Sequence, residues 1–179
     1  PNTARFPFLT KPVSEGDTIQ LDAFGLSMKV MEVPGHTKDH IAYMSDLGLF
    51  CGDTLFSAGC GRLFEGNAEQ MQTNFERFKH LPSATKVYCT HEYTLSNLDF
   101  AVAVWPQNSE IVDYRNKAQA QRAKDMPTLP SDIELESKIN PFMNTDDADI
   151  KNNVEQHLGS ACASPTDVFA ALRSWKDNF

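Results

Sequence analysis

The sequence lacks several features that would assign it to common classes of protein. No apolar run approaches the ~20 residues of a membrane-spanning helix. The four cysteines, Cys51, Cys60, Cys89 and Cys162, form no C-x-x-C pair, which argues against zinc fingers and thioredoxin-like redox sites. The formal net charge of −8 argues against a general affinity for nucleic acid. We therefore expect a cytoplasmic protein with free thiols that binds neither membranes nor nucleic acid.

The composition is that of a folded globular protein. Of the 179 residues, 41% are hydrophobic and 22% are charged, so the chain can form one medium domain or two small ones. An acidic chain of this kind needs local cations if it is to bind an anionic small molecule. Basic residues that gather near a candidate site would therefore indicate an anionic ligand.

The pattern of predicted elements changes near residue 94. Before it, alternating apolar residues predict strands at residues 18–24, 27–33, 41–45, 49–51 and 86–89. Gly25 splits the first two strands into a hairpin, and the glycines at 59, 61 and 66 predict a loop. After His91 no strand is predicted, and helices are expected over residues 95–104, 110–124, 149–157 and 166–176. We therefore predict an α/β (α+β) fold with two units, residues 1–94 and residues 95–179.

Local signals predict where three of the helices begin. Asn67 followed by Gln70 is typical of a capping box at the start of a helix. Ser131 followed by Glu134 has the same spacing and predicts a second capping box. A Ser-Pro pair at residues 164–165 predicts an N-cap with proline at the first helical position.

Three short segments carry the candidate catalytic and metal-binding residues. They are PGHTKDH at residues 34–40, CGDTLF at residues 51–56 and CTHEYT at residues 89–94. Each places a His or an Asp at the end of a short apolar run, where a strand delivers a side chain to the rim of a sheet. His36, Asp53 and His91 together supply two imidazoles and a carboxylate, which suit a divalent-metal site with an open position for water.

Each of these residues also has an ordinary structural interpretation. A lone histidine more often satisfies hydrogen bonds in the core or lies on the surface, and Asp53 could simply stabilise a turn. His40, four residues after His36, could support a metal ligand, but a structural role is favoured, and His80 and His157 are interpreted as surface residues. The combination of the three candidate ligands favours a metal site, whereas cysteine ligands are disfavoured.

Longer segments resemble one known family. They are TLFSAGCGRLFEG at residues 54–66, HEYTLSNL at residues 91–98 and LRSWKDNF at residues 172–179. All three are similar to glyoxalase II, the hydroxyacylglutathione hydrolase of the metallo-β-lactamase superfamily, and to its bacterial branch in particular. The likeness runs from about residue 18 to residue 179. It implies a thiolester hydrolase that cleaves S-D-lactoylglutathione to D-lactate and glutathione during methylglyoxal detoxification.

The resemblance implies roles for the three candidate metal ligands. His36 matches the third histidine ligand of a first metal, and His91 matches a ligand of a second metal. Asp53 matches the carboxylate that bridges the two metals, and it is the residue implied to be catalytic. The family uses two divalent metals, with zinc expected here and iron or manganese as alternatives.

The resemblance also implies a set of residues that bind glutathione. Arg62 and Tyr93 match a cation and a phenol that contact the ligand, and Phe64 stands where some relatives have tyrosine. Arg173 and Lys176 match a basic pair that holds the glycine carboxylate. The sequence itself places these two residues three apart, on one side of the last helix. Taken without the resemblance, the pair is more typical of a solvated helix end favoured by the helix dipole.

The family's His-x-His-x-Asp-His signature, which would precede these segments, has no match in the sequence. Two protein ligands then remain for each metal, fewer than the three that catalytic zinc usually has. The resemblance therefore implies an N-terminally truncated form: the C-terminal half of a metallo-β-lactamase αββα sandwich, followed by an all-helical glutathione-binding domain. We expect its metals to be incomplete or absent and its activity alone to be negligible. We also expect self-association through the uncovered sheet.

Two other functions remain open from the sequence. The first is a non-catalytic module that binds glutathione conjugates without metal, which measured metal content and turnover would distinguish. The second is another enzyme of the same fold, such as a persulfide dioxygenase with one iron, a lactonase or a β-lactamase. The basic pair Arg173 and Lys176 disfavours these enzymes.

Overall fold

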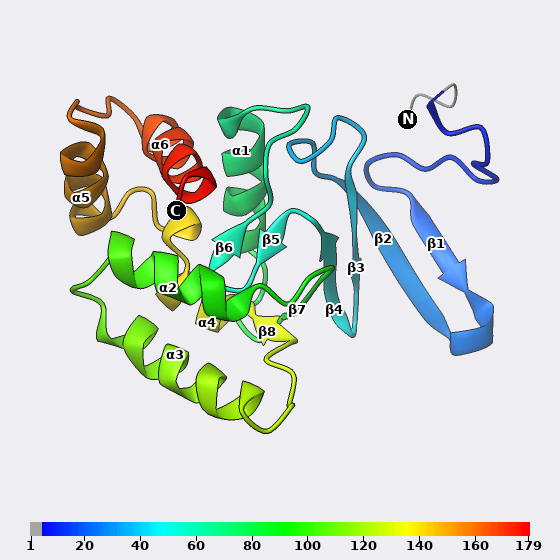
Figure 1. Cartoon of the computed structure of the whole chain (residues 1–179). Coiled ribbons are helices and arrows are strands. Elements are labelled where there is room, and N and C mark those ends of the chain that lie inside the picture. Colours follow the sequence, from blue (N-terminus) through cyan, green and yellow to red (C-terminus); the bar gives the residue numbers. More distant parts are fainter. Residues whose placement is uncertain (1–4) are drawn as a thin grey trace.

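The computed structural model describes residues 5–179 and has a mixed α/β fold (Figure 1). Its main sheet has the strand order β1-β2-β3-β4-β7-β8. These strands are β1 (Thr18–Leu21), β2 (Leu26–Glu32), β3 (Ile41–Ser45), β4 (Gly48–Gly52), β7 (Lys86–Cys89) and β8 (Ser131–Asp132). Neighbouring strands are antiparallel except for β4 and β7, which are parallel. The parallel pair therefore brings the segments that follow residues 52 and 89 to the same edge of the sheet.

The predicted hairpin at the start of the chain is confirmed, with one change. Strands β1 and β2 pair in antiparallel register, with Leu21 opposite Leu26. Residues Asp22–Phe24 form a 3-10 turn rather than continuing the strand. Gly25 ends this turn in the left-handed region, at φ 61°, a conformation that glycine adopts without steric cost.

A second, small sheet lies where the sequence predicted a loop. Strands β5 (Leu55–Phe56) and β6 (Gly59–Cys60) form an antiparallel hairpin, so the prediction of a loop was wrong at Gly59 and Cys60. Strands of two residues are too short to leave a periodic signal. Gly61 follows the hairpin where its backbone packs so closely that a Cβ would lie 1.9 Å from the carbonyl oxygen of Asp53. This close packing fixes the hairpin beside the segment that carries Asp53.

Six α-helices complete the described part of the chain. They are α1 (Ala68–Lys79), α2 (Thr94–Val104), α3 (Ser109–Arg122), α4 (Ile133–Ile139), α5 (Ala148–Leu158) and α6 (Pro165–Asp177). The capping box of Asn67 and Gln70 is present at α1, and Ser164 caps α6 as predicted. Within residues 5–179, none of these helices is both long and apolar enough to cross a membrane.

The capping prediction at Ser131 was wrong. The N-cap of α4 is Asp132, whose side chain accepts the backbone N–H of Leu135 at 2.9 Å. Ser131 instead belongs to β8, a strand that pairs antiparallel with β7, so strand structure does continue after His91. No pattern in the sequence predicts β8, because this two-residue strand forms only through pairing with β7.

We predict that Asp132→Ala lowers the free energy of unfolding by about 1 kcal/mol, since it removes the cap of α4. Glu134→Ala, which would break the capping box predicted from the sequence, should change it by less than about 0.5 kcal/mol, as expected of an exposed ion pair with Lys138. Urea denaturation of both variants measures the difference. A larger loss from Glu134→Ala would contradict the cap seen in the structure.

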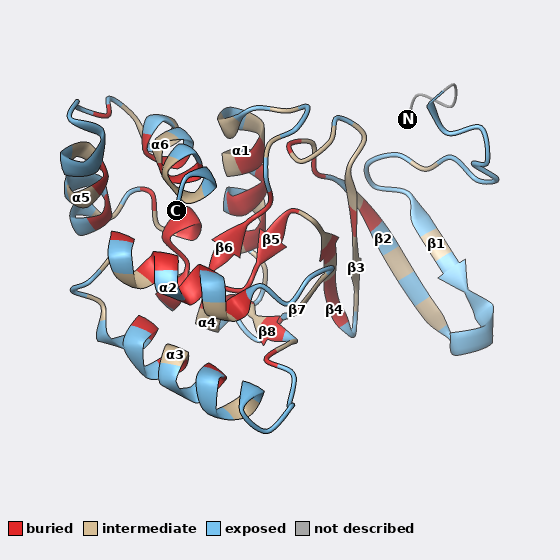
Figure 2. Ribbon diagram, in the orientation of Figure 1, coloured by how far each residue is buried: buried red, intermediate tan, exposed pale blue. Residues whose placement is uncertain are grey.

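The hydrophobic core fills the space between one face of the main sheet and the helices (Figure 2). Ala42, Leu49 and Val87 contribute from the sheet, and all three are fully buried. Phe75 of α1 and Phe169 of α6 meet them from the helical side, with ring centroids 5.4 Å apart. This core crosses the predicted boundary at residues 94 and 95, so the division into two units stays a prediction.

The opposite face of the main sheet is apolar but only partly buried. Tyr43, Phe50 and Tyr88 lie side by side on it, as the strand register shows. The rings of Phe50 and Tyr88 stack with centroids 4.7 Å apart. The edge strand β1 beside this face is largely exposed.

Candidate active site

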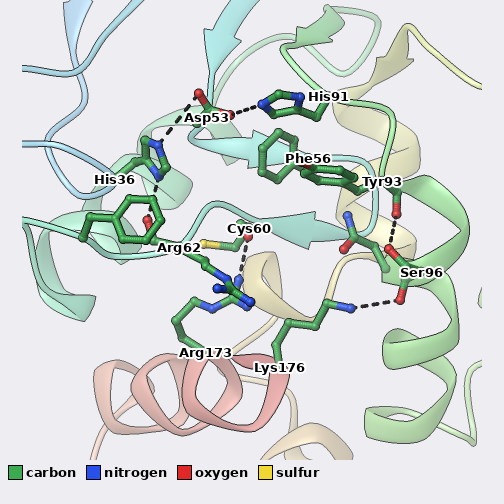
Figure 3. Close-up of a pocket in the computed structure, with 12 residues that line it drawn as sticks. His36, Asp53, Phe56, Cys60, Arg62, His91, Tyr93, Ser96, Arg173 and Lys176 are labelled. Atoms are coloured by element: carbon green, nitrogen blue, oxygen red, sulfur yellow. Dashed lines mark hydrogen bonds and ion pairs between the residues drawn. The ribbon is translucent and has the colours of Figure 1, made fainter. Parts of the chain in front are cut away.

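A pocket of about 580 Å³ opens at the edge of the sheet where β4 and β7 end (Figure 3). It is lined by residues from the β4–β5 segment, the β5–β6 hairpin and the N-terminal turn of α2, together with residues of α6. Every site residue predicted from the sequence lies on its wall: His36, Asp53, Arg62, Phe64, His91, Tyr93, Arg173 and Lys176. The structure thus brings together residues separated by up to 140 positions in the chain, and their individual roles stay predictions.

Asp53 lies between the two histidines at the inner end of the pocket. Its Oδ2 is 3.9 Å from Nε2 of His36, and its Oδ1 is 3.2 Å from Nε2 of His91. One carboxylate oxygen therefore faces each imidazole, as in a carboxylate that bridges two ions. The parallel pairing of β4 and β7 produces this arrangement, because Asp53 and His91 follow the ends of these two strands.

Hydrogen bonds to the surrounding backbone orient His36 and Asp53. Nδ1 of His36 donates to the carbonyl oxygen of Arg62 at 2.8 Å, which leaves Nε2 as a lone-pair donor directed at Asp53. Nε2 of His40 accepts the backbone N–H of Asp53 at 3.0 Å. Burial lowers the pKa of His40 and so favours the neutral ring that this bond requires, with the neighbouring His36 adding to the shift. His40 thus holds the Asp53 segment in place, in agreement with its structural interpretation.

The donors at the Asp53 end of the pocket suit a divalent metal only in part. The lone pair on Nε2 of His36 and the two-sided carboxylate of Asp53 suit part of such a site. Within residues 5–179, however, no group of three or more His, Cys, Asp or Glu side chains is arranged to hold one ion. The residues described here therefore do not complete the ligand set that a catalytic zinc requires.

Two basic residues of α6 reach the pocket from the side opposite Asp53. Arg173 is nine-tenths buried; its Nη1 donates to the carbonyl oxygen of Cys60 at 2.6 Å and its Nη2 contacts Asp177 at 3.0 Å. Nζ of Lys176 donates to the carbonyl oxygen of Ser96 at 3.0 Å. Burial lowers the pKa of Lys176, and the nearby Arg173 lowers it further. The two cations are therefore held in fixed positions on the pocket wall.

Arg62 supplies a third cation at the mouth of the pocket. Its side chain is 62% exposed, and its Nε lies 3.3 Å from the same Asp177 carboxylate that Arg173 contacts. Three cations thus face one cavity of a chain whose net charge is −8. This local concentration of positive charge suits a ligand with carboxylate groups.

Aromatic rings separate the cations from the Asp53 end of the pocket. The ring of Tyr93 stacks on His91 at 5.0 Å between centroids and meets the edge of Phe56 at 5.4 Å. On the other side, Phe64 lies 5.0 Å from His36. Phe64 and Tyr93 are exposed, so their rings offer apolar surface to a ligand.

Some residues that line the pocket were not predicted from the sequence. They are Phe56, Cys60, Ser96 and Asn97. Phe56 and Asn97 lie within the segments that carry the family resemblance, but single residues of these types have no chemical signature. Burial raises the pKa of the Cys60 thiol to about 12, so this cysteine is neutral and not a nucleophile at physiological pH.

Comparison with known proteins identifies the family. The sequence profile described as "Hydroxyacylglutathione hydrolase C-terminus" matches residues 92–179. A hydroxyacylglutathione hydrolase of Shewanella halifaxensis is 48% identical over 179 residues, covering 100% of this chain and 69% of its own length. That of Nitrosomonas europaea is 43% identical, covering 100% of this chain and 68% of its own length. The chain belongs to the hydroxyacylglutathione hydrolase family, glyoxalase II, and it spans about two thirds of the length of these relatives.

Solved structures show the class of fold. A metallo-β-lactamase from Staphylococcus aureus matches 93% of this chain and 43% of its own, with a TM-score of 0.53 and 19% identity. ETHE1 from Myxococcus xanthus matches 94% of this chain and 60% of its own, with a TM-score of 0.55 and 23% identity. The fold is therefore that of part of a metallo-β-lactamase, as predicted.

Proposed function

We propose that this chain forms the glutathione-binding wall and part of the metal site of a hydrolase that cleaves hydroxyacylglutathione thiolesters, S-D-lactoylglutathione in particular. The single observation that carries the proposal is the pocket itself. It places three cations, Arg62, Arg173 and Lys176, on the wall opposite a carboxylate between two imidazoles. Membership of the hydroxyacylglutathione hydrolase family supports the choice of substrate.

The cations and the aromatic rings of the pocket would bind the glutathione part of the substrate. Glutathione is a peptide with two carboxylates, and charge-assisted hydrogen bonds to Lys and Arg suit such groups. Tyr93 and Phe64 would cover the apolar thioester portion between the cations and Asp53. These contacts would orient the acyl group toward the Asp53 end of the pocket.

Asp53, His36 and His91 would contribute ligands to a divalent-metal site, with zinc as the proposed metal. His36 carries the clearest evidence, because its bond to Arg62 leaves Nε2 free to bind an ion. Since the donors described here do not complete that site, further ligands must come from outside them.

Calorimetric titration of the chain with S-methylglutathione tests the proposed ligand directly. This thioether has the two carboxylates of the substrate's glutathione part, and it carries a methyl group on sulfur in place of the acyl group, so it has no thioester bond to cleave. We expect one site with affinity that falls as salt is added, because exposed charges are screened. A folded chain that produced no binding heat and no ligand-induced spectral change would contradict the proposed function.

A non-catalytic module that binds glutathione conjugates would use the same pocket as the hydrolase. The two functions differ only at the Asp53 end of the pocket, where the hydrolase needs metal ligands. The inward orientation of Nε2 of His36 toward Asp53 favours the hydrolase, because a module that only binds glutathione needs no such arrangement. As for location, we propose the cytoplasm. The four cysteines are all unpaired, which suits a reducing compartment.

We also propose that the isolated chain self-associates through the apolar sheet face of Tyr43, Phe50 and Tyr88 and the adjoining edge strand β1. Sedimentation velocity should show a species larger than a monomer that dissociates on dilution. Phe50→Lys should shift the population toward monomer, because it places a charge at the centre of this face. Phe24→Lys, at an exposed residue outside it, is the matched control. A native chain that sediments as a monomer at all concentrations would contradict self-association.

A further inference from the structure

A buried carboxyl group lies behind the pocket, outside the set of residues assigned above. Glu136 is on α4 and is fully buried. Its Oε2 accepts the backbone N–H of Ala58 at 2.8 Å and Nδ2 of Asn140 at 3.0 Å. Glu136 does not line the pocket, but both contacts lead to the β5–β6 hairpin, which does.

Two further buried side chains hold the same hairpin. Nδ2 of Asn140 donates to the carbonyl oxygens of Phe56 at 3.2 Å and Gly59 at 3.0 Å. Nδ2 of Asn97 donates to the carbonyl oxygen of Ser57 at 3.0 Å. Three buried side chains thus bind consecutive polar groups of one turn; one comes from α2, one from α4 and one from the residue after α4. Each hydrogen bond of this buried network is costly to lose.

The turn of this hairpin has little freedom to adopt another shape. Ala58 has φ 54°, in the left-handed region that residues with a side chain seldom occupy. Its N–H is the group that Glu136 accepts, so the carboxyl group supports a backbone conformation that is unfavourable by itself. At Gly59 a Cβ would lie 2.4 Å from Nδ2 of Asn97, which leaves no room for a side chain.

The hairpin in turn sets the position of residues proposed to bind the ligand. The carbonyl oxygen of Cys60, in β6, accepts Nη1 of Arg173 at 2.6 Å. The ring of Phe56, in β5, meets Tyr93 at 5.4 Å between centroids. A shift of the hairpin would therefore move both the buried cation and the exposed phenol of the pocket (Figure 3).

The surroundings of Glu136 favour its neutral form. Burial raises the pKa of this carboxyl group above its ordinary value of 4.5. Oε1 of Glu136 and the hydroxyl groups of Ser57 and Ser131 are buried, and within residues 5–179 none of them has a hydrogen-bond partner. A proton on Oε1 would supply a donor among these oxygens, so glutamine, which has a donor at the same place, is a close mimic of the acid.

We propose that Glu136 is a positioning residue for thioester binding: it fixes the β5–β6 hairpin and thereby the orientation of Arg173 and Tyr93. This inference rests on the proposed function, because it assigns Glu136 to the binding of the same ligand. Glu136 touches no ligand itself and acts through the backbone of Ala58 and, by way of Cys60, on Arg173.

The test compares three variants of the full chain. Glu136→Ala removes the acceptor of Ala58, and Glu136→Gln keeps an acceptor and a donor in the same shape. Glu155→Ala is the matched control, because Oε1 of Glu155 also accepts a backbone N–H, that of Cys162 at 2.8 Å, far from the pocket. The affinity for S-methylglutathione is measured by calorimetry. The amide signals of residues 58–60 and the guanidinium signal of Arg173 are followed by NMR without ligand.

We expect Glu136→Ala to weaken binding about 10-fold or more, because small displacements of binding groups are costly. Its amide and guanidinium signals should move as well. Glu136→Gln and Glu155→Ala should leave affinity within about twofold of native and the Arg173 signal unmoved, even where Glu155→Ala lowers stability. Native affinity in Glu136→Ala, or equal damage from Glu136→Gln, would overturn the proposal.

The NMR measurement keeps this proposal separate from the proposed function. If the native chain fails to bind S-methylglutathione, the proposed function fails, and the Arg173 signal in Glu136→Ala alone decides whether Glu136 positions the hairpin. If Glu136→Ala does not fold, Gly59→Ala replaces it. The added methyl displaces the turn from Asn97 while Glu136 remains, so affinity should fall and the Arg173 signal should move. Unchanged values in that variant would overturn the proposal.

Discussion

Asp53→Ala should cause the largest loss of hydrolysis of any single substitution in the site. The Asp53 carboxylate faces both His36 and His91, so its removal affects both halves of the proposed metal site. Substituting a group that merely supports a metal ligand already costs 10–100-fold, so we expect a loss of at least about 100-fold in turnover together with loss of bound metal. The assay uses this chain mixed with a segment of a relative that carries the His-x-His-x-Asp-His motif, with zinc added.

The matched control for this prediction is Asp39→Ala. Asp39 lies on the same loop as His36, but its carboxylate contacts Arg5 at 2.9 Å and does not line the pocket. We expect turnover and metal content close to native in this variant. Near-normal turnover with full metal content in Asp53→Ala would show that Asp53 does not bridge metals.

Lys176→Met should weaken the binding of S-methylglutathione strongly. Methionine keeps an apolar stem beside the rings of Phe100 and Phe179, which lie 5.2 and 5.5 Å from Nζ, and removes the charge together with the hydrogen bond to Ser96. A hydrogen bond to a charged group contributes about 1.5–3 kcal/mol, so the dissociation constant should rise about 10- to 150-fold. Calorimetry at low salt measures this change.

Two further substitutions show whether the effect belongs to the pocket. Arg173→Lys keeps the charge but loses the planar fork that binds Cys60 and Asp177, so its affinity should also fall. Lys151→Met removes a lysine on α5 whose ammonium group lies 3.8 Å from the carboxylate of Glu155 and does not line the pocket, so affinity should stay unchanged. Equal affinities in Lys176→Met and Lys151→Met would exclude Lys176 from the ligand site.

Much of the site could be predicted because its residues follow elements with a strong local signal. The strands at residues 41–45 and 86–89 have clear apolar patterns and lie where the sequence placed them. The sequence predicted that Asp53 and His91 lie near His36. Asp53 and His91 lie close together because they follow the ends of two neighbouring strands that are parallel. The positions of Arg173 and Lys176 on one side of α6 followed from helical spacing.

The remaining features depend on tertiary contacts that leave no periodic pattern in the sequence. Strand β8 exists only because Ser131 and Asp132 pair with β7, so the cap of α4 was assigned one residue too early. Each strand of the β5–β6 hairpin is two residues long, and its turn is held by Glu136 and by other side chains distant in sequence. An ordinary helical glutamate cannot be distinguished from a buried positioning residue until the fold is known.

The most direct test of the account is steady-state hydrolysis of S-lactoylglutathione with excess zinc. It is measured first with this chain alone and then with the segment that carries the His-x-His-x-Asp-His motif. We expect negligible turnover by the chain alone, because His36, Asp53 and His91 do not complete a metal site. We expect zinc-dependent turnover when the chain and the segment are mixed. Robust turnover by the chain alone, or none by a mixture in which the two demonstrably associate, would contradict the proposed incomplete metal site.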